Sequence, residues 1–507
     1  MLKILAGIET EYGLFIEGRG AEEQVDDATA FVRAYPGPHF AGWDYRYESP
    51  RADLRGFSVS RLQVDPIDAK FDSGVFRSSD PDIRSDRVLP NGARFYNDHG
   101  HPEYSTPECW GTKELSVQDA AGEIVLLDTA KVMERETDRK VSVYKNNTDF
   151  HGASYGTHES YSMPRAVGFE RIYGAVTPML VSRQILTGAG KVGAEKGQSC
   201  AYQLSQRADF FVESFNTETL FRRPVFNTRD EAHADPRDWI RVHIISGDAN
   251  MIPSCTARKV GLVKLALALE MTKEAPLWKL KNPVEAFQNI SRDESYKFEV
   301  QLEGGSWTTA QEILESYFSA AEAVFGLRPG FDMGTPEAEA FDLIGECRQL
   351  LQDLTECPER FSRSVDWAAK KKMLEHFMAE EGSDWNDPSL RAFDLEYHNI
   401  DPAEGLYFAL LEMDAVESSP SMETLQECLK QNREGTRAMA RGMAVSKFKE
   451  SVVSLSWRSI VFRDDNKDIE VLLEPDQVYP AQLDEAQDVG TFIKWIQEIS
   501  SSKAKID

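Results

Sequence analysis

The stretch that decides the fold is Asn91–Glu108, which reads NGARFYNDHGHPEYSTPE. Polar and aromatic residues alternate in it on both sides of Gly100: Arg94, Tyr96 and Asp98 before the glycine, and His101, Glu103 and Ser105 after it. Residues two apart on a β-strand point to the same face, and glycine permits a bend between strands. We therefore predict two strands with one polar face, which is either a functional site or an ordinary solvated surface.

The second of these strands carries two prolines, Pro102 and Pro107. Proline has no backbone N–H to donate to a neighbouring strand, so within sheets it is usually confined to edges, bulges or strand ends. This piece is therefore predicted to be an edge strand or an irregular strand.

The amino-terminal stretch Leu5–Gly13, LAGIETEYG, could complete a site on that face. Glu9 and Glu11 are two apart, so in a strand their carboxylates share a face and repel each other. A divalent cation relieves such repulsion, and hard cations such as Mg²⁺ prefer oxygen ligands. With Glu103 added, the pattern suits a Mg²⁺–nucleotide site in which Asp98 is either a further ligand or the reacting group. The simpler alternative is an exposed strand end with two solvated glutamates.

Composition and charge argue against several classes of protein. The 507 residues carry a formal net charge of −27, which argues against nonspecific binding to nucleic acid and against attachment to an anionic membrane. There is no uninterrupted apolar run of about 18 residues, so no transmembrane helix is expected. The six cysteines are scattered without a C-x-x-C pair, and the amino terminus does not read as a secretory signal. A cytoplasmic protein is predicted.

Patterns along the chain predict an α+β protein with two parts. Residues 1–433 are expected to form the larger, catalytic domain, an antiparallel β-sheet packed with helices. Within it, the polar stretch from about 42 to 88 is predicted to be a long mobile loop, because loops of that length are usually functional or disordered. Strand patterns return near Phe448, and residues 434–507 are expected to form a small α+β domain.

Three further polar residues could extend the site. His158 alternates with small residues in ASYGTHES, which leaves room for a metal or phosphate, although a structural hydrogen bond is the simpler role. Arg207 and Arg229 stand among polar neighbours, and a guanidinium fork suits triphosphate oxygens. A surface salt bridge is the alternative for either arginine. The residues alone therefore predict an ATP- and Mg²⁺-dependent enzyme with a reactive aspartate.

Motifs spread over almost the whole chain carry a resemblance to a known family. They are GIETEYG at Gly7, NGARFYNDHGHPEYSTPE at Asn91, YKNNTDFHGASYGTHESY at Tyr144, QLSQRADFF at Gln203, RPVFNTRDEAHADP at Arg223 and RVHIISGDAN at Arg241. In this order they resemble the Pup ligase/Pup deamidase family, which acts with the prokaryotic ubiquitin-like protein Pup. That family is related in fold to glutamine synthetase, so a glutamine-synthetase-like sheet is expected.

The resemblance implies an ATP/Mg-dependent hydrolase that removes Pup from substrate lysines and deamidates the C-terminal glutamine of Pup to glutamate. Pup and pupylated proteins would be the partners, with a functional link to the bacterial proteasome. Two features favour this hydrolase branch over the ligase branch. They are the long insertion that begins WDYRYESPRADLRGF and the spacing in DHGHPEYS.

The resemblance also implies roles for individual residues. Asp98 matches the catalytic aspartate, proposed as nucleophile or base. The implied magnesium ligands are Glu9, Tyr96 and Glu103, with Glu11 and His158 nearby. Arg94, Thr106 and Trp457 match contacts to ATP (or ADP), and Arg207 and Arg229 match arginines near the phosphates and the scissile carbonyl.

Three alternatives remain open at this point. The first is a Pup–protein ligase, which phosphorylates the C-terminal glutamate of Pup and couples it to lysine. The second is a catalytically silent regulator that binds Pup or ATP. The third is a ligase for small γ-glutamyl substrates, against which the long insertion and the C-terminal domain speak.

Overall fold

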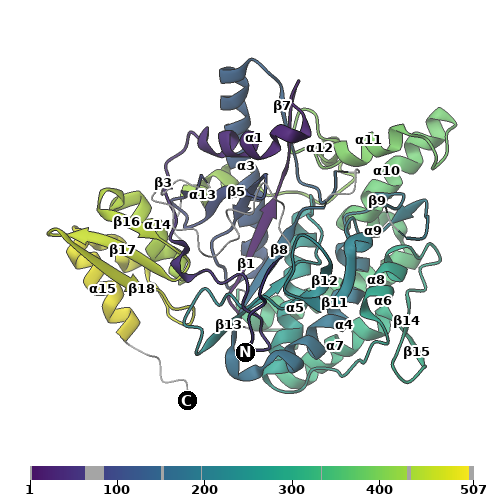
Figure 1. Cartoon of the computed structure of the whole chain (residues 1–507). Helices are drawn as coiled ribbons and strands as arrows, with labels where there is room; N and C mark the ends of the chain where they lie inside the picture. The colour runs from purple at the N-terminus through teal and green to yellow at the C-terminus, as the bar shows by residue number, and fades with distance from the viewer. Residues whose placement is uncertain are drawn as a thin grey trace.

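The computed structural model describes residues 3–62, 85–149, 154–195, 197–332, 334–430 and 435–501. A nine-stranded sheet forms its centre (Figure 1). Across the sheet the order is β11 (Phe211–Asn216), β12 (Arg223–Asn227), β13 (Trp239–Ile244), β8 (Thr157–Pro164), β1 (Ala6–Glu11), β6 (His101–Ser105), β5 (Arg94–Asp98), β4 (Arg87–Val88) and β3 (Phe40–Ala41). Every neighbouring pair is antiparallel except β11 and β12.

Helices cover the apolar face of this sheet. Ile8, Tyr104 and Val242 belong to the main hydrophobic core together with residues of these helices. Helix α3 packs on β1 and β6, and α4 packs on β12. The bounds of the core helices are α3 (Thr112–Thr137), α4 (Phe169–Thr187), α5 (Pro253–Met271), α6 (Pro283–Ser291) and α7 (Ala310–Phe325). Because strand residues alternate between faces, the opposite face is left for polar side chains.

The remaining elements surround the main sheet. Helix α7 shows how local sequence sets a boundary: Thr309 and Glu312 form a capping box at its start, and Gly326 ends it in the left-handed region with φ of 61°. The other helices are α1 (Gln24–Arg33), α8 (Pro336–Glu356), α9 (Pro358–Ser364), α10 (Asp366–Glu381), α11 (Ser389–Glu396), α12 (Leu406–Glu412) and α13 (Met422–Lys430). Three small sheets pair β2 (Gly13–Ile16) with β7 (Val141–Tyr144), β9 (Lys191–Val192) with β10 (Tyr202–Gln203), and β14 (Glu299–Gln301) with β15 (Trp307–Thr309).

The C-terminal elements gather at one side of the main sheet, on the left of Figure 1. They are α14 (Arg437–Lys447), β16 (Val452–Leu455), β17 (Ser459–Asp464), β18 (Lys467–Leu472) and α15 (Val489–Ser501). Their apolar side chains form a second core, which Trp43 and Val88 join from the main part of the chain. The expected domain boundary at 433/434 lies outside the described residues, so the division stays a prediction.

The predicted edge position of β6 is wrong. This strand lies between β1 and β5 and pairs with both in regular antiparallel register. Pro102 is tolerated because the pairing of β1 ends at Glu11 opposite Glu103, so the missing N–H falls just beyond the ladder. The carbonyl of Pro102 still accepts a hydrogen bond of 2.9 Å from the N–H of Tyr12. Pro107 follows the end of the strand and interrupts no pairing.

The stretch from 42 to 88 was predicted to be a long mobile loop, and its mobility stays a prediction; some described residues near its two ends are buried. Residues 63–84 lie outside the described residues. On the amino-terminal side, Trp43 is buried in the second core, and Asp53 is 1% exposed. On the carboxyl-terminal side, Asp86 is fully buried. Strands β3 and β4 pair with each other, so the two ends of the stretch meet at one edge of the main sheet.

The structure agrees with the fold class predicted from the sequence. One large sheet and many helices in mixed order confirm an α+β protein. Among the described residues, no helix combines the length and the apolar character that crossing a membrane requires. All six cysteines are free thiols, as their scattered spacing indicated.

Candidate active site

The register of the sheet brings the predicted residues together in two rows. One row runs Arg94, Ser105, Glu9 and His158 across β5, β6, β1 and β8. The next row runs Tyr96, Glu103 and Glu11 across β5, β6 and β1. Because residues two apart share a face, both rows lie on the same side of the sheet, away from the helices that cover the other side. The polar residues that alternate in Leu5–Gly13 and in Asn91–Glu108 therefore lie side by side on one face of the sheet.

Three carboxylates form one cluster on this face. Oxygens of Glu11, Asp98 and Glu103 lie within 4.8 Å of one another, and the hydroxyl of Tyr96 donates a hydrogen bond of 2.5 Å to Glu103. Burial, followed by the negative charges of Asp98, Glu9 and Glu11, raises the pKa of Glu103 well above its usual range. A divalent cation would remove this repulsion. The all-oxygen ligand set fits Mg²⁺.

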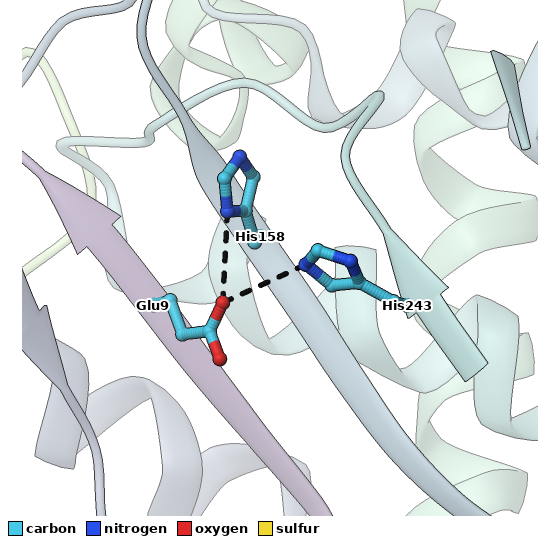
Figure 2. Close-up of side chains that lie close together, drawn as sticks. All are labelled: Glu9, His158 and His243. Carbon is cyan, nitrogen blue, oxygen red and sulfur yellow. Dashed lines mark ion pairs between the residues drawn. The ribbon is translucent and has the colours of Figure 1, made fainter. Parts of the chain in front are cut away.

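A second cluster joins Glu9 to two histidines from neighbouring strands (Figure 2). His158 Nδ1 and His243 Nε2 each lie 3.6 Å from Glu9 Oε2. Neither ring nitrogen of His243 has a hydrogen-bond partner within the described part of the chain. Burial, followed by the nearby charge of Arg241, lowers the pKa of His243 well below its usual range, which keeps the imidazole neutral. Neutral imidazole is the form that binds metals, so this set also fits a divalent cation.

Glu9 stands between the two clusters and stays ionised. Arg241 on β13 donates a hydrogen bond of 3.1 Å to Glu9 Oε1. Burial by itself would raise the pKa of Glu9, but Arg241 and the two histidines His158 and His243 hold that pKa well below its usual range. An ionised carboxylate beside the neutral imidazole of His243 is ready to bind a cation.

Two adjoining cavities open on this face. One has a volume of about 100 Å³ and is lined mostly by polar groups. The predicted site residues on its wall are Glu9, Arg94, Tyr96, Asp98, His158, Arg229 and Trp457. The other cavity, of about 50 Å³, shares Glu9 and Trp457 with the first and also contains Thr106. Most of the predicted residues therefore lie around one continuous region.

Arg94 is held firmly on the wall of the polar cavity. Its guanidinium lies 4.2 Å from the ring centroid of Trp43 and 3.8 Å from that of Tyr96, between the two rings. It forms an ion pair of 2.6 Å with Asp86 and donates a hydrogen bond of 3.1 Å to the hydroxyl of Tyr45. Its expected contact with a nucleotide stays a prediction.

The two other predicted arginines occupy different positions. Arg229 lines the polar cavity and donates a hydrogen bond of 3.2 Å to Thr219 Oγ1. Arg207 is fully buried beyond the walls of these two cavities, where its Nε lies 3.3 Å from Ser154 Oγ. Burial, followed by the like charge of Arg223, lowers the pKa of Arg207. Two adjacent guanidinium groups with few carboxylate partners suit an anionic ligand.

Trp457 is the contribution of the C-terminal elements to the site. Its ring lies edge-on to Trp43 at 5.0 Å and nearly parallel to the ring of His233 at 6.0 Å. The guanidinium of Arg441 lies 4.8 Å from its centroid. Thr106 accepts a hydrogen bond of 3.0 Å from the N–H of Ile8 and lines the smaller cavity beside this indole.

A buried charge cluster fixes α14 against the main sheet. Arg437 and Arg441, four residues apart on the helix, both form ion pairs with Glu108. Burial would raise the pKa of Glu108, but the two arginines lower it to about 2. Because Trp457 follows this helix and stacks on Arg441, the cluster also sets the position of the indole.

Sequence reasoning missed several residues of this region. Arg241 and His243 contact Glu9, and Glu231 contacts Arg241. A signal was present in RVHIIS, because Arg241 and His243 are two apart and residues two apart in a strand share a face. What was missing was the register that places β13 next to β8.

The fold and the site together define a protein with a carboxylate- and arginine-lined pocket on an antiparallel sheet. The chain belongs to the Pup-ligase protein family, which it matches over residues 4–461. It is 35% identical to the depupylase of Acidothermus cellulolyticus, over 90% of this chain and 90% of that one. The family resemblance of the sequence is thereby confirmed.

Two solved structures are similar to most of the chain. One is the complex between the prokaryotic ubiquitin-like protein Pup and its ligase PafA, with a TM-score of 0.76, 27% identity and coverage of 98% of this chain and 93% of that chain. The other is the Pup ligase PafA in complex with ADP, with a TM-score of 0.70, 28% identity and coverage of 87% and 96%.

Proposed function

We propose that the protein is a depupylase and Pup deamidase. It hydrolyses the isopeptide bond between the C-terminal side-chain carboxyl of Pup and a substrate lysine, and it converts a C-terminal glutamine of Pup to glutamate. In both reactions a C–N bond breaks, water adds a hydroxyl to the carbonyl carbon, and the amine or ammonia leaves with a proton. The observation that carries this proposal is the Asp98 carboxylate, which lies on the wall of the polar cavity beside Glu11 and Glu103.

Asp98 has two chemical roles open to it. As an ionised carboxylate, it can attack the carbonyl carbon, or it can take a proton from the attacking water. Arg229 lines the same cavity, and its proposed role is to stabilise the negative charge that develops on the carbonyl oxygen. The indole of Trp457 lines both cavities, and apolar surface beside charged groups strengthens their interactions.

The proposed cofactors are ATP (or ADP) and Mg²⁺. Glu9, Glu11, Glu103 and Tyr96 would hold the metal, with His158 and His243 beside Glu9. Bound Mg²⁺ neutralises phosphate charge and fixes the orientation of the phosphates. Arg94, Arg207, Thr106 and Trp457 are the proposed contacts to the nucleotide. Support comes from the raised pKa of Glu103 and from the ADP complex of the similar ligase structure.

The proposed partners are Pup and pupylated proteins, and the proposed location is the cytoplasm. We also propose a functional link to the bacterial proteasome. The main rival is a Pup–protein ligase, because the similar structures are ligases. The relative with 35% identity over 90% of both chains is a depupylase, and the insertion after Gly42 also favours the hydrolase.

Two reciprocal assays with the full-length protein test this choice. In the first, a preformed Pup–substrate conjugate is incubated with Mg²⁺ and ATP, and both conjugate and ADP are followed. In the second, Pup ending in glutamate is incubated with ATP and an acceptor protein. A hydrolase removes the conjugate with far less than one ADP per bond. Accumulation of new conjugate with one ADP per bond would instead establish a ligase.

A further inference from the structure

Arg241 lies between two carboxylates that come from different parts of the site. One of its terminal nitrogens donates to Glu9 Oε1 at 3.1 Å, and the other donates to Glu231 Oε2 at 3.2 Å. Arg241 is 6% exposed and Glu231 is 7% exposed, so solvent screens this arrangement little. Glu231 therefore offsets a positive charge that would otherwise act on Glu9 alone.

The charge of Arg241 opposes the binding of a cation by Glu9 and its neighbours His158 and His243. A guanidinium next to a metal ligand repels a divalent ion and competes for the carboxylate oxygen. We propose that Glu231 is a positioning residue that sets the cation affinity of this cluster by sharing Arg241. The inference rests on the proposed function, since that function requires a cation at Glu9.

Glu231 is itself held by the chain that precedes the undescribed residues 63–84. The N–H of Ser49 donates a hydrogen bond of 2.8 Å to Glu231 Oε1. The same stretch is fixed to the β12–β13 connection by hydrogen bonds of 2.8 Å from Leu54 N–H to the carbonyl of Thr228 and from Asp230 N–H to the carbonyl of Ala52. A glutamine at position 231 can still accept from Ser49 through its carbonyl oxygen. Glu231→Gln therefore removes the charge and keeps this link.

The neighbouring residue offers a matched control. Asp230 carries the same charge and forms an ion pair of 2.9 Å with Arg165. It lies outside the set of residues lining either cavity. Asp230→Asn therefore removes one negative charge next to Glu231 without changing what surrounds Arg241. Glu231→Asp serves as the conservative variant, because it keeps the charge if Glu231→Gln does not fold.

The test measures Mn²⁺ binding directly, by electron paramagnetic resonance, on the full-length protein without nucleotide. Glu231→Gln is expected to weaken Mn²⁺ binding roughly 3- to 10-fold, because the charge of Arg241 then acts on Glu9 and on the ion without being offset. Asp230→Asn and Glu231→Asp are expected to stay within about twofold of the wild type. In an Arg241→Gln background, Glu231→Gln should change the affinity by less than about twofold, because the charge that it offsets is gone.

A second readout follows the conjugate cleavage rate against Mg²⁺ concentration. For Glu231→Gln, the Mg²⁺ concentration at half-maximal rate should rise by the same factor. Equal Mn²⁺ affinity in Glu231→Gln and wild type would overturn the inference alone, and so would an equal loss in Asp230→Asn. A wild type that binds no Mn²⁺ would overturn the metal part of the proposed function as well.

Discussion

Glu11 on β1 and Glu103 on β6 are directly opposite each other on adjacent antiparallel strands, and both are buried. Like charges at opposed positions destabilise a sheet, and the oxygens of Asp98 lie within 4.8 Å of both. The repulsion among these three carboxylates destabilises the folded state unless a cation binds between them. This repulsion is what binding of the proposed cation would relieve.

Removing one of these charges should stabilise the protein in the absence of divalent cations. Because the pKa of Glu103 is raised well above its ordinary value of 4.5, ionising this group weakens the folded state as pH rises through the folded pKa. Glu103→Gln should therefore raise the Tm by about 1 °C at pH 8 in EDTA, the size expected for ~1 kcal/mol in a chain of 507 residues. The difference should shrink as the pH approaches 5. A lower Tm for the variant at pH 8 would show that the repulsion is already compensated.

The stability that the buried charge cluster of α14 contributes should depend on pH in the opposite sense. The pKa of Glu108 is lowered to about 2, so its contribution is present above the ordinary value of 4.5 and is lost as pH falls from there towards 2. Glu108→Gln should cost about 3 kcal/mol in free energy of unfolding at pH 7. The deficit should shrink as the pH falls below 4.5 and disappear below about pH 2.

Denaturant unfolding at several pH values measures this prediction. Asp468→Asn is the matched control, because Asp468 pairs with Arg463 while 49% exposed, and it should change stability by less than about 0.5 kcal/mol. A deficit in Glu108→Gln that does not vary with pH would mean that packing, rather than charge, accounts for the role of Glu108.

Trp457 should contribute to nucleotide affinity. Its indole lines both cavities and is fixed by Trp43 and Arg441. Loss of a stacking ring typically costs about 1–3 kcal/mol, so Trp457→Ala should raise the Kd for ADP by roughly 5- to 150-fold in calorimetry. Trp307→Ala removes an indole that is 61% exposed and should leave the Kd unchanged. Unchanged ADP binding by Trp457→Ala would remove Trp457 from the nucleotide site.

Much of the site could be predicted from alternation alone. Arg94, Tyr96 and Asp98 share a face as expected, and Glu9, Glu11 and Glu103 converge on that same face. The two arginines of α14 also share one face as their spacing indicated. Local periodicity sets which way a side chain points, and it is visible in a single sequence.

The features that could not be predicted depend on contacts between residues far apart in the sequence. The place of β6 between β1 and β5, and the approach of His243 to Glu9, follow from strand order and register. Helix α4 was not predicted either. Nearly all of its residues are buried, so it lacks the polar stripe that makes a helix visible in a sequence. Pro178 within it further weakens the helical pattern.

The most direct test of the account is the activity of Asp98→Asn beside its capacity to bind cofactors. The substitution keeps the size of the side chain and removes the carboxylate that is proposed to act on the carbonyl. Cleavage of a fluorescent Pup conjugate should fall by at least about 10³-fold, while ADP and Mn²⁺ still bind within about tenfold of the wild type. Cleavage by Asp98→Asn at a rate close to that of the wild type would contradict the central claim.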